Sequence, residues 1–113
     1  MTTLNLTTRE RPGGVHVELA GELDIATAPK LDETLRQLEG AGHGLIVIDL
    51  RGLEFMDSSG LRSLLGADTR AREAGRRVVL VRGDDRVQRV LRITRLDERL
   101  EIVEDAEQLA GAA

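Results

Sequence analysis

Two short polar segments of this chain carry residue types from which a functional site can be built. Residues 57–60 read Asp-Ser-Ser-Gly and combine a carboxylate with two hydroxyl groups, and residues 21–24 read Gly-Glu-Leu-Asp. Each segment follows a predicted strand and precedes a predicted helix. In open α/β sheets the functional groups gather in such loops, beyond the carboxyl ends of the strands. We therefore expect the functional site at these two segments.

The Asp-Ser-Ser-Gly segment has two interpretations. It begins a helix, where unpaired amide N–H groups and the helix dipole stabilise an anion. The first interpretation is structural, because Asp and Ser are the residue types favoured as helix N-caps. The second is a serine that accepts a phosphoryl group, which would add about −1.5 to −2 charges beside Asp57 and repel a partner that had buried the hydroxyl. The segment alone leaves both interpretations open.

Glycines and histidines offer weaker candidates. Gly40, Gly42 and Gly44 follow a predicted helix and precede a strand, which is the reverse of the order in a phosphate-binding loop, so we expect a flexible connection. His16 and His43 have no cysteine partner and no second histidine one helical turn away, which argues against a metal site.

Enzyme chemistry finds little support in the sequence. A triad of Ser58, His43 and an aspartate is geometrically open, but the Gly-x-Ser-x-Gly pattern of a nucleophile elbow does not surround the serine. Asp49 and Asp57 suggest an acidic pair, but a receiver domain also needs a lysine near its last strand, and Lys30 falls in another element. We predict a structural turn role for Asp49, and a protein that is not an enzyme and uses no cofactor or metal.

The elements that position the two segments follow from hydrophobic periodicity. Alternation at residues 4–6 and 15–19 predicts a β-hairpin, whose second strand ends at Gly21. Apolar residues at helical spacing predict a helix over 27–38 with Thr27 as its N-cap. A continuous apolar run over 45–50 predicts a central strand covered on both faces.

The second half of the chain continues the alternation of strand and helix. The pattern predicts a helix over 61–71 stopped by Gly75, a strand over 77–81, and a helix that starts at Asp84 or Asp85. A short strand over 100–103 and a weak helix over 106–110 follow. The chain is therefore predicted to be one α/β domain over residues 1–113, with a mixed, mostly parallel sheet of four to five strands, an N-terminal hairpin and about four helices.

Composition narrows the classes of partner. The chain has 113 residues, a formal net charge of −4, no cysteine, and Phe55 as its only aromatic residue, which argues against nucleic acid as the main partner. No apolar run reaches the roughly 20 residues of a membrane span, and the first residues are too polar for a signal peptide, so we expect a cytoplasmic protein. A solvated face is expected for the arginines spaced by threes, which are Arg86, Arg89, Arg92 and Arg95.

Three segments together carry a resemblance to a family. GELDIATAPKL at residues 21–31, LIVIDL at 45–50 and LEFMDSSGL at 53–61 resemble the bacterial anti-sigma factor antagonists, the single-domain members of the STAS family. The resemblance covers almost the whole chain and implies the STAS fold. It also implies that the unphosphorylated protein binds an anti-sigma factor, a serine kinase of the histidine-kinase-like ATPase fold, and so releases the sigma factor.

The resemblance assigns roles to individual residues. It implies that the kinase phosphorylates Ser58 and thereby inactivates the protein, and that a PP2C-type phosphatase reverses this. Partner-binding positions are implied for Asp24, Asp57, Ser58, Ser59 and Gly60. Arg62 stands where relatives often carry glycine or another small residue, which puts the identity of the partner in question, and we include it in the partner-binding set.

Two alternatives stay open at this point. One is a STAS docking subunit of a larger assembly, such as a stress-signalling or lipid-transport complex, that works without a phosphoswitch. The other is a domain that senses a nucleotide. For the free protein, a monomer is the expectation.

Overall fold

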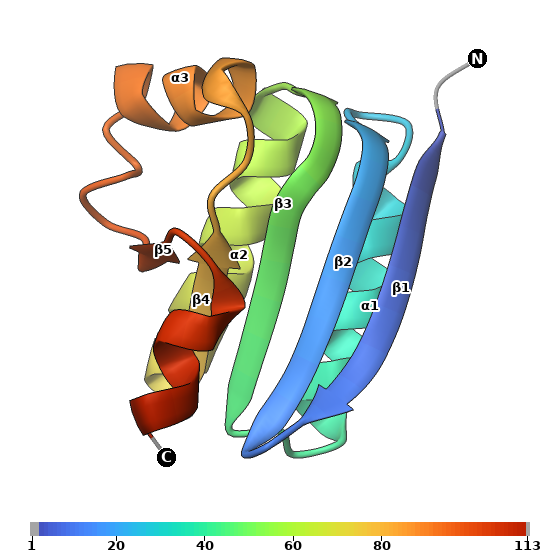
Figure 1. Cartoon of the computed structure of the whole chain (residues 1–113). Coiled ribbons are helices and arrows are strands. Elements are labelled where there is room, and N and C mark those ends of the chain that lie inside the picture. Colours follow the sequence, from blue (N-terminus) through green and yellow to red (C-terminus); the bar gives the residue numbers. More distant parts are fainter. Residues whose placement is uncertain (1–2, 113) are drawn as a thin grey trace.

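A mixed β-sheet runs through the molecule, with its strands side by side in the order in which they occur in the sequence (Figure 1). The structure is a computed structural model that describes residues 3–112. Within this range the sheet has five strands: β1 (Leu4–Arg11), β2 (Gly14–Leu23), β3 (Leu45–Met56), β4 (Arg77–Val81) and β5 (Ile102–Val103). β1 and β2 form the predicted antiparallel hairpin, and the other neighbouring strands are parallel.

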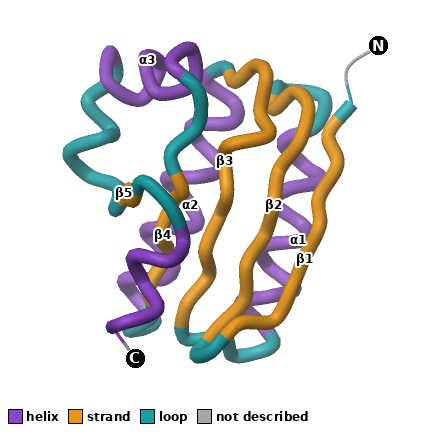
Figure 2. The backbone as a smooth tube through the Cα atoms, viewed as in Figure 1, coloured by secondary structure: helices purple, strands orange, loops and turns teal. Residues whose placement is uncertain are grey.

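Helices cover the sheet unequally (Figure 2). The residues described form α1 (Ala28–Gly40), α2 (Ser58–Glu73), α3 (Asp85–Ile93) and a 3-10 helix, η1 (Ala106–Ala112). α1 and α2 lie side by side on one face, α3 lies at the carboxyl end of the sheet, and η1 lies on the opposite face over β4 (Figure 1). The predicted four helices are thus three α-helices and one 3-10 helix.

The core lies mainly between the sheet and the two long helices. Inward-facing side chains alternate along β2 and β3, and Leu31 and Leu35 of α1 pack against them. The other face of β3 and β4 forms a smaller cluster with Leu109 of η1. The prediction that 45–50 is a central strand covered on both faces is therefore confirmed.

β2 and β3 extend further than predicted. β2 passes Gly21, where φ is +111°, and continues to Leu23, and β3 continues beyond residue 50 to Met56. The pairing register shifts near Gly52, where a Cβ atom would lie only 2.5 Å from the carbonyl oxygen of Leu19. Such an irregularity bends the strand without ending it. As a result, Leu23 pairs with Met56, and both polar segments follow directly from that pair.

Candidate functional site

The two polar segments meet at the carboxyl edge of the sheet. The Asp57 amide N–H donates a hydrogen bond of 3.2 Å to the carbonyl oxygen of Leu23, the last residue of β2. Asp24 is the next residue after Leu23, so the first loop lies beside the start of α2. The structure therefore brings the two segments together.

Asp57 is the N-cap of α2. Its Oδ1 accepts hydrogen bonds from the amide N–H groups of Ser59 at 2.9 Å and Gly60 at 3.4 Å, which otherwise have no partner in the first turn. A Cβ atom at position 60 would lie 2.7 Å from Cγ of Leu23, so glycine lets the helix approach β2 closely. Asp57 therefore fixes the backbone on both sides of Ser58.

Ser58 is the first residue of α2, and its side chain is exposed. Its hydroxyl makes no hydrogen bond to any group in the part of the chain that the structure describes. The cap is made by the preceding aspartate, so the serine is not needed for it. The structural interpretation of the Asp-Ser-Ser-Gly segment thus applies to Asp57, and the Ser58 hydroxyl faces solvent.

Asp24 organises the loop between β2 and α1. Its Oδ1 accepts hydrogen bonds from the amide N–H groups of Ala26 at 2.9 Å and Thr27 at 3.1 Å. Thr27 occupies the predicted N-cap position of α1, but its side chain does not cap the helix. Instead, the Thr27 hydroxyl accepts from the Asp24 amide at 2.9 Å and lies 2.8 Å from the Glu22 carbonyl oxygen, to which it can donate. These bonds hold the loop in one shape next to Ser58.

Exposed apolar and cationic side chains lie in the segments that adjoin the start of α2. Ile25, in the first loop, is 78% exposed, and Phe55, near the end of β3, is 49% exposed. A hollow of about 210 Å³ lies between the first turns of α1 and α2, and its lining includes Ile25, Asp32, Ser59 and Arg62. Arg62 is exposed and lies one helical turn after Ser58. The site therefore combines a free hydroxyl with carboxylates, exposed apolar side chains and one arginine.

A second hollow lies beside the residues that precede Asp57, and the sequence patterns did not indicate it. Its volume is about 310 Å³, and it lies between the end of β3 and α3, lined by Phe55, Met56, Val87 and Val90 together with Glu54, Arg86 and Arg89. The exposed aromatic residue after a buried strand was the available signal. Locating the hollow also required knowing that β3 extends to Met56 and that α3 packs against it.

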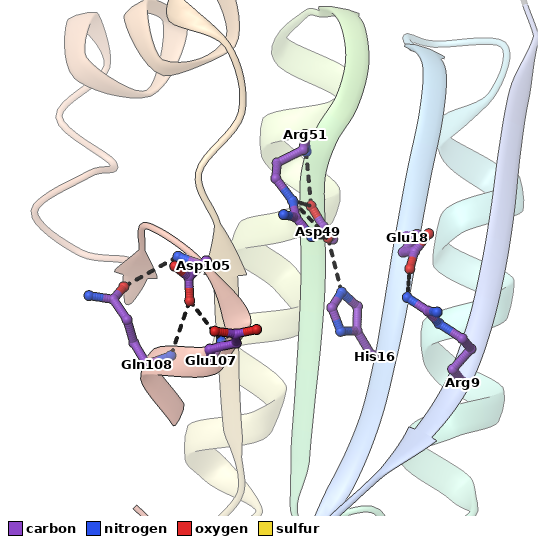
Figure 3. Close-up of polar contacts among 8 residues, drawn as sticks. All are labelled: Arg9, His16, Glu18, Asp49, Arg51, Asp105, Glu107 and Gln108. Carbon is purple, nitrogen blue, oxygen red and sulfur yellow. Dashed lines mark hydrogen bonds and ion pairs between the residues drawn. The ribbon is translucent and has the colours of Figure 1, made fainter. Parts of the chain in front are cut away.

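Asp49 does not lie in a turn, contrary to the prediction. It is a buried residue in the middle of β3, only 3% exposed, where His16 Nε2 of β2 lies 3.0 Å from its Oδ2 (Figure 3). Arg51 contributes its amide N–H to Oδ1 at 3.0 Å and its guanidinium to Oδ2 at 2.7 Å. Burial alone would raise the pKa of Asp49, but the hydrogen bonds from Arg51 and His16 outweigh it and hold that pKa below its ordinary value.

The other weak candidates lie away from Ser58. His43, Gly42 and Gly44 are in the connection from α1 to β3, and Gly40 is the last residue of α1. This connection is at the opposite end of β3 from α2, so the Ser58–His43 triad does not form. No group of three or more potential metal-ligating side chains occurs within the described residues. None of the helices described is long and apolar enough to span a membrane.

The arginines spaced by threes are exposed, as predicted for a solvated face. α3 ends at Ile93, so Arg95 lies beyond it, with φ of +61°. Asp84, one of the two predicted caps, is the N-cap, and it accepts a hydrogen bond from the Val87 amide at 3.1 Å. Asp84 also pairs with Arg86 at 3.0 Å.

Comparisons with known proteins agree with this architecture. The anti-sigma-B factor antagonist of Staphylococcus aureus is 29% identical over 104 residues, which cover 92% of this chain and 96% of that protein. The crystal structure of an anti-sigma factor antagonist from Mycobacterium paratuberculosis is similar with a TM-score of 0.84 at 25% identity, over 97% of this chain and 93% of that one. The Bacillus cell fate determinant SpoIIAA, in its phosphorylated form, shares the fold with a TM-score of 0.73 at 20% identity, over 98% of this chain and 100% of that one. The family model of the STAS domain matches residues 5–109, and the chain therefore belongs to the STAS domain family.

Proposed function

We propose that this chain is an anti-sigma factor antagonist whose activity is switched by phosphorylation of Ser58. In the unphosphorylated form it binds an anti-sigma factor that is also a serine kinase, and the sigma factor is released. The observation that carries the proposal is the exposed Ser58 hydroxyl on a backbone fixed by Asp57. The names of the relatives, and the phosphorylated form in which one of them was solved, support it.

The phosphorylation step needs only a presented hydroxyl from this chain. Ser58 Oγ forms a bond to the γ-phosphorus of ATP while the bond from that phosphorus to the β,γ-bridging oxygen breaks. ADP leaves, and the hydroxyl proton is lost to the kinase or to water. ATP and Mg²⁺ come with the kinase, so this domain contributes position and no catalytic group, which is why we propose that it is not an enzyme. A PP2C-type phosphatase hydrolyses the phosphoserine, and the cycle runs in the cytoplasm.

Phosphorylation changes the surface in a way that disfavours the complex. The phosphate adds about −1.5 to −2 charges at a position flanked by Asp24 and Asp57. The first turn of α2 stabilises this charge within the protein, because helix N-termini favour anions. A partner that had covered a neutral hydroxyl would then have to bury a hydrated dianion beside two carboxylates, which is costly. Phosphorylation thus lowers the affinity of the protein for its partner and leaves the fold unchanged.

Purified components test this proposal directly. The kinase is captured from host lysate with Ser58→Ala, identified and purified, and then incubated with ATP and each variant. We expect one phosphate on the wild type, located at Ser58 by tandem mass spectrometry, and none on Ser58→Ala. Ser59→Ala is the matched control for the site of modification, because it removes the neighbouring hydroxyl and leaves Ser58, so it should still accept one phosphate.

Binding measurements complete the test. Ser58→Ala should bind the kinase as tightly as the wild type, whereas the phosphorylated protein should bind at least roughly thirtyfold more weakly, as expected when a charge is forced into an interface. Phosphate on Ser59, or a phosphorylated protein that binds as tightly as the free one, would contradict the proposed switch. A stable complex that contains no kinase would favour a docking subunit instead.

A further inference from the structure

The two hollows near residues 55–62 differ in the side chains that line them. On the side of α1 lies the hollow of about 210 Å³, which is lined by Asp32 and Arg62 together with Ile25. On the side of α3 lies the hollow of about 310 Å³, which we call the β3–α3 groove and which holds Phe55 and the exposed Arg86 and Arg89. The α1 side therefore carries one carboxylate and one arginine, whereas the α3 side carries an aromatic ring, two arginines and one carboxylate.

The β3–α3 groove has an apolar interior. Met56 and Val87 are buried, and Val90 is half-buried, whereas Phe55 lies half-exposed beside them. A monomeric protein has no need to leave an aromatic ring at the mouth of an apolar hollow, and such features mark interaction sites. Aromatic residues are also enriched in the centres of protein interfaces.

Its two arginines are not equivalent. Arg86 is engaged with Asp84, the N-cap of α3. Arg89 makes no hydrogen bond or ion pair with any group among the residues described, and Glu54 is the one carboxylate that lines the groove with it. An unpaired guanidinium beside an apolar hollow suits a carboxylate, which it binds in a bidentate geometry.

We propose that the β3–α3 groove is a second contact for the kinase that acts on Ser58, and that it receives an apolar side chain flanked by an acidic residue. This inference rests on the proposed function and names the surface chemistry of that partner. Met56 lines the groove and Ser58 follows two residues later, so the two contacts are continuous. A stable interface covers roughly 800 Å² on each partner, which reaches well beyond one serine. The charge of Arg89 favours a docking orientation that brings the acidic residue of the partner to the α3 side.

Affinity of the purified kinase for matched pairs of variants tests the inference. Arg89→Glu is compared with Arg92→Glu, which makes the same charge change on the same helix but outside the groove. Phe55→Ala is compared with Ile93→Ala, since Ile93 is 69% exposed and also lies outside the groove. All four side chains are exposed, so the variants should fold, and thermal unfolding by circular dichroism verifies that they do.

We expect both groove variants to weaken binding by roughly tenfold, as is typical for an aromatic anchor and for an arginine whose charge is reversed. Both control variants should stay within about twofold of the wild type, as expected for groups outside the interface core. A photo-crosslinking residue at position 89 should attach to a kinase segment in which Asp or Glu flanks an apolar residue. Reversing that acidic charge in the kinase should then restore binding to Arg89→Glu.

Other outcomes separate the two proposals. If Arg89→Glu and Phe55→Ala bind as tightly as the wild type while phosphorylation of Ser58 still abolishes binding, the groove inference is overturned and the proposed function stands. Cross-links between two copies of this chain would make a second copy the occupant and would also overturn it. If the wild type neither binds a kinase nor accepts phosphate at Ser58, both proposals fail.

Discussion

Asp49 and Asp57 belong to the same stretch of chain, yet their surroundings differ in kind. Asp49 lies buried within β3, where its carboxylate accepts from His16 on the neighbouring strand and from Arg51 two residues on. Asp57 lies just after β3, where its carboxylate accepts from two backbone amides of α2. Asp49 links two strands through hydrogen bonds between side chains. Asp57 caps the first turn of α2 and leaves the adjacent Ser58 hydroxyl free. Residue type alone does not separate a structural aspartate from one that supports a site, but its hydrogen-bond partners do.

Removing Asp49 should produce the largest loss of stability. Asp49→Ala leaves the half-buried His16 and the Arg51 amide without their partner, which should lower the free energy of unfolding by roughly 2–3 kcal/mol. Urea unfolding followed by circular dichroism measures this change, with Arg51→Ala as a control that should cost less than about 1 kcal/mol because the side chain is largely exposed. Phosphorylation of Ser58 in the folded variant should be unchanged. If Asp49→Ala were as stable as the wild type, the structural role of Asp49 would be contradicted.

Removing Asp57 should have a smaller effect on stability and a larger one on the proposed function. Asp57→Ala loses the N-cap of α2, which should lower the free energy of unfolding by about 1 kcal/mol. Because the backbone beside Ser58 is then less well fixed, the rate of phosphorylation by the kinase should fall roughly tenfold, as expected when a reacting group is misplaced. If Asp57→Ala lost stability but accepted phosphate at the wild-type rate, the role of Asp57 in supporting the Ser58 site would be contradicted.

A pH titration should give the smallest and most specific effect. The pKa of Asp49 lies below its ordinary value in the folded protein, so the unfolded chain binds this proton more readily. The stability that Asp49 contributes is therefore complete above its unfolded pKa of about 3.9 and is lost as the pH falls through the folded pKa. Between about pH 5 and about pH 3 the wild type should lose more stability than Asp49→Asn, which has no such proton to bind. If the free energy of unfolding fell equally with pH in the two proteins, the loss of stability at low pH would have to come from other carboxylates.

Much of the fold could be predicted because local patterns and tertiary contacts agree. The alternation in β1 and β2, the apolar run of β3 and the helical spacing in α2 each led to an element that the structure contains. The position of Asp57 and Ser58 at the start of α2 followed from the preference for such residues at helix N-termini. The STAS resemblance, carried by the two polar segments and the strand between them, is confirmed by the family match.

The rest depended on pairing that sequence patterns do not encode. Arg51 and Gly52 resemble a turn, but β3 passes through them with a shift in register, because glycine at 52 allows close contact with the backbone of β2. The bond between His16 and Asp49 depends on the pairing of β2 with β3, in which His16 lies opposite Val47, so neither residue alone predicts it. The β3–α3 groove likewise depends on where α3 packs, and helical periodicity does not specify that.

The sequential order of the strands has a consequence for how the protein is made. Every strand in the sheet pairs with the strand that precedes it along the chain, beginning with the hairpin of β1 and β2. The hairpin closes a short loop and is expected to form first, whereas each parallel pair needs a crossover connection and is expected to form more slowly. As synthesis on the ribosome proceeds from the N-terminus, each emerging strand finds the strand with which it pairs already present. A regulator built in this order can become ready for its partner soon after its last strand leaves the ribosome.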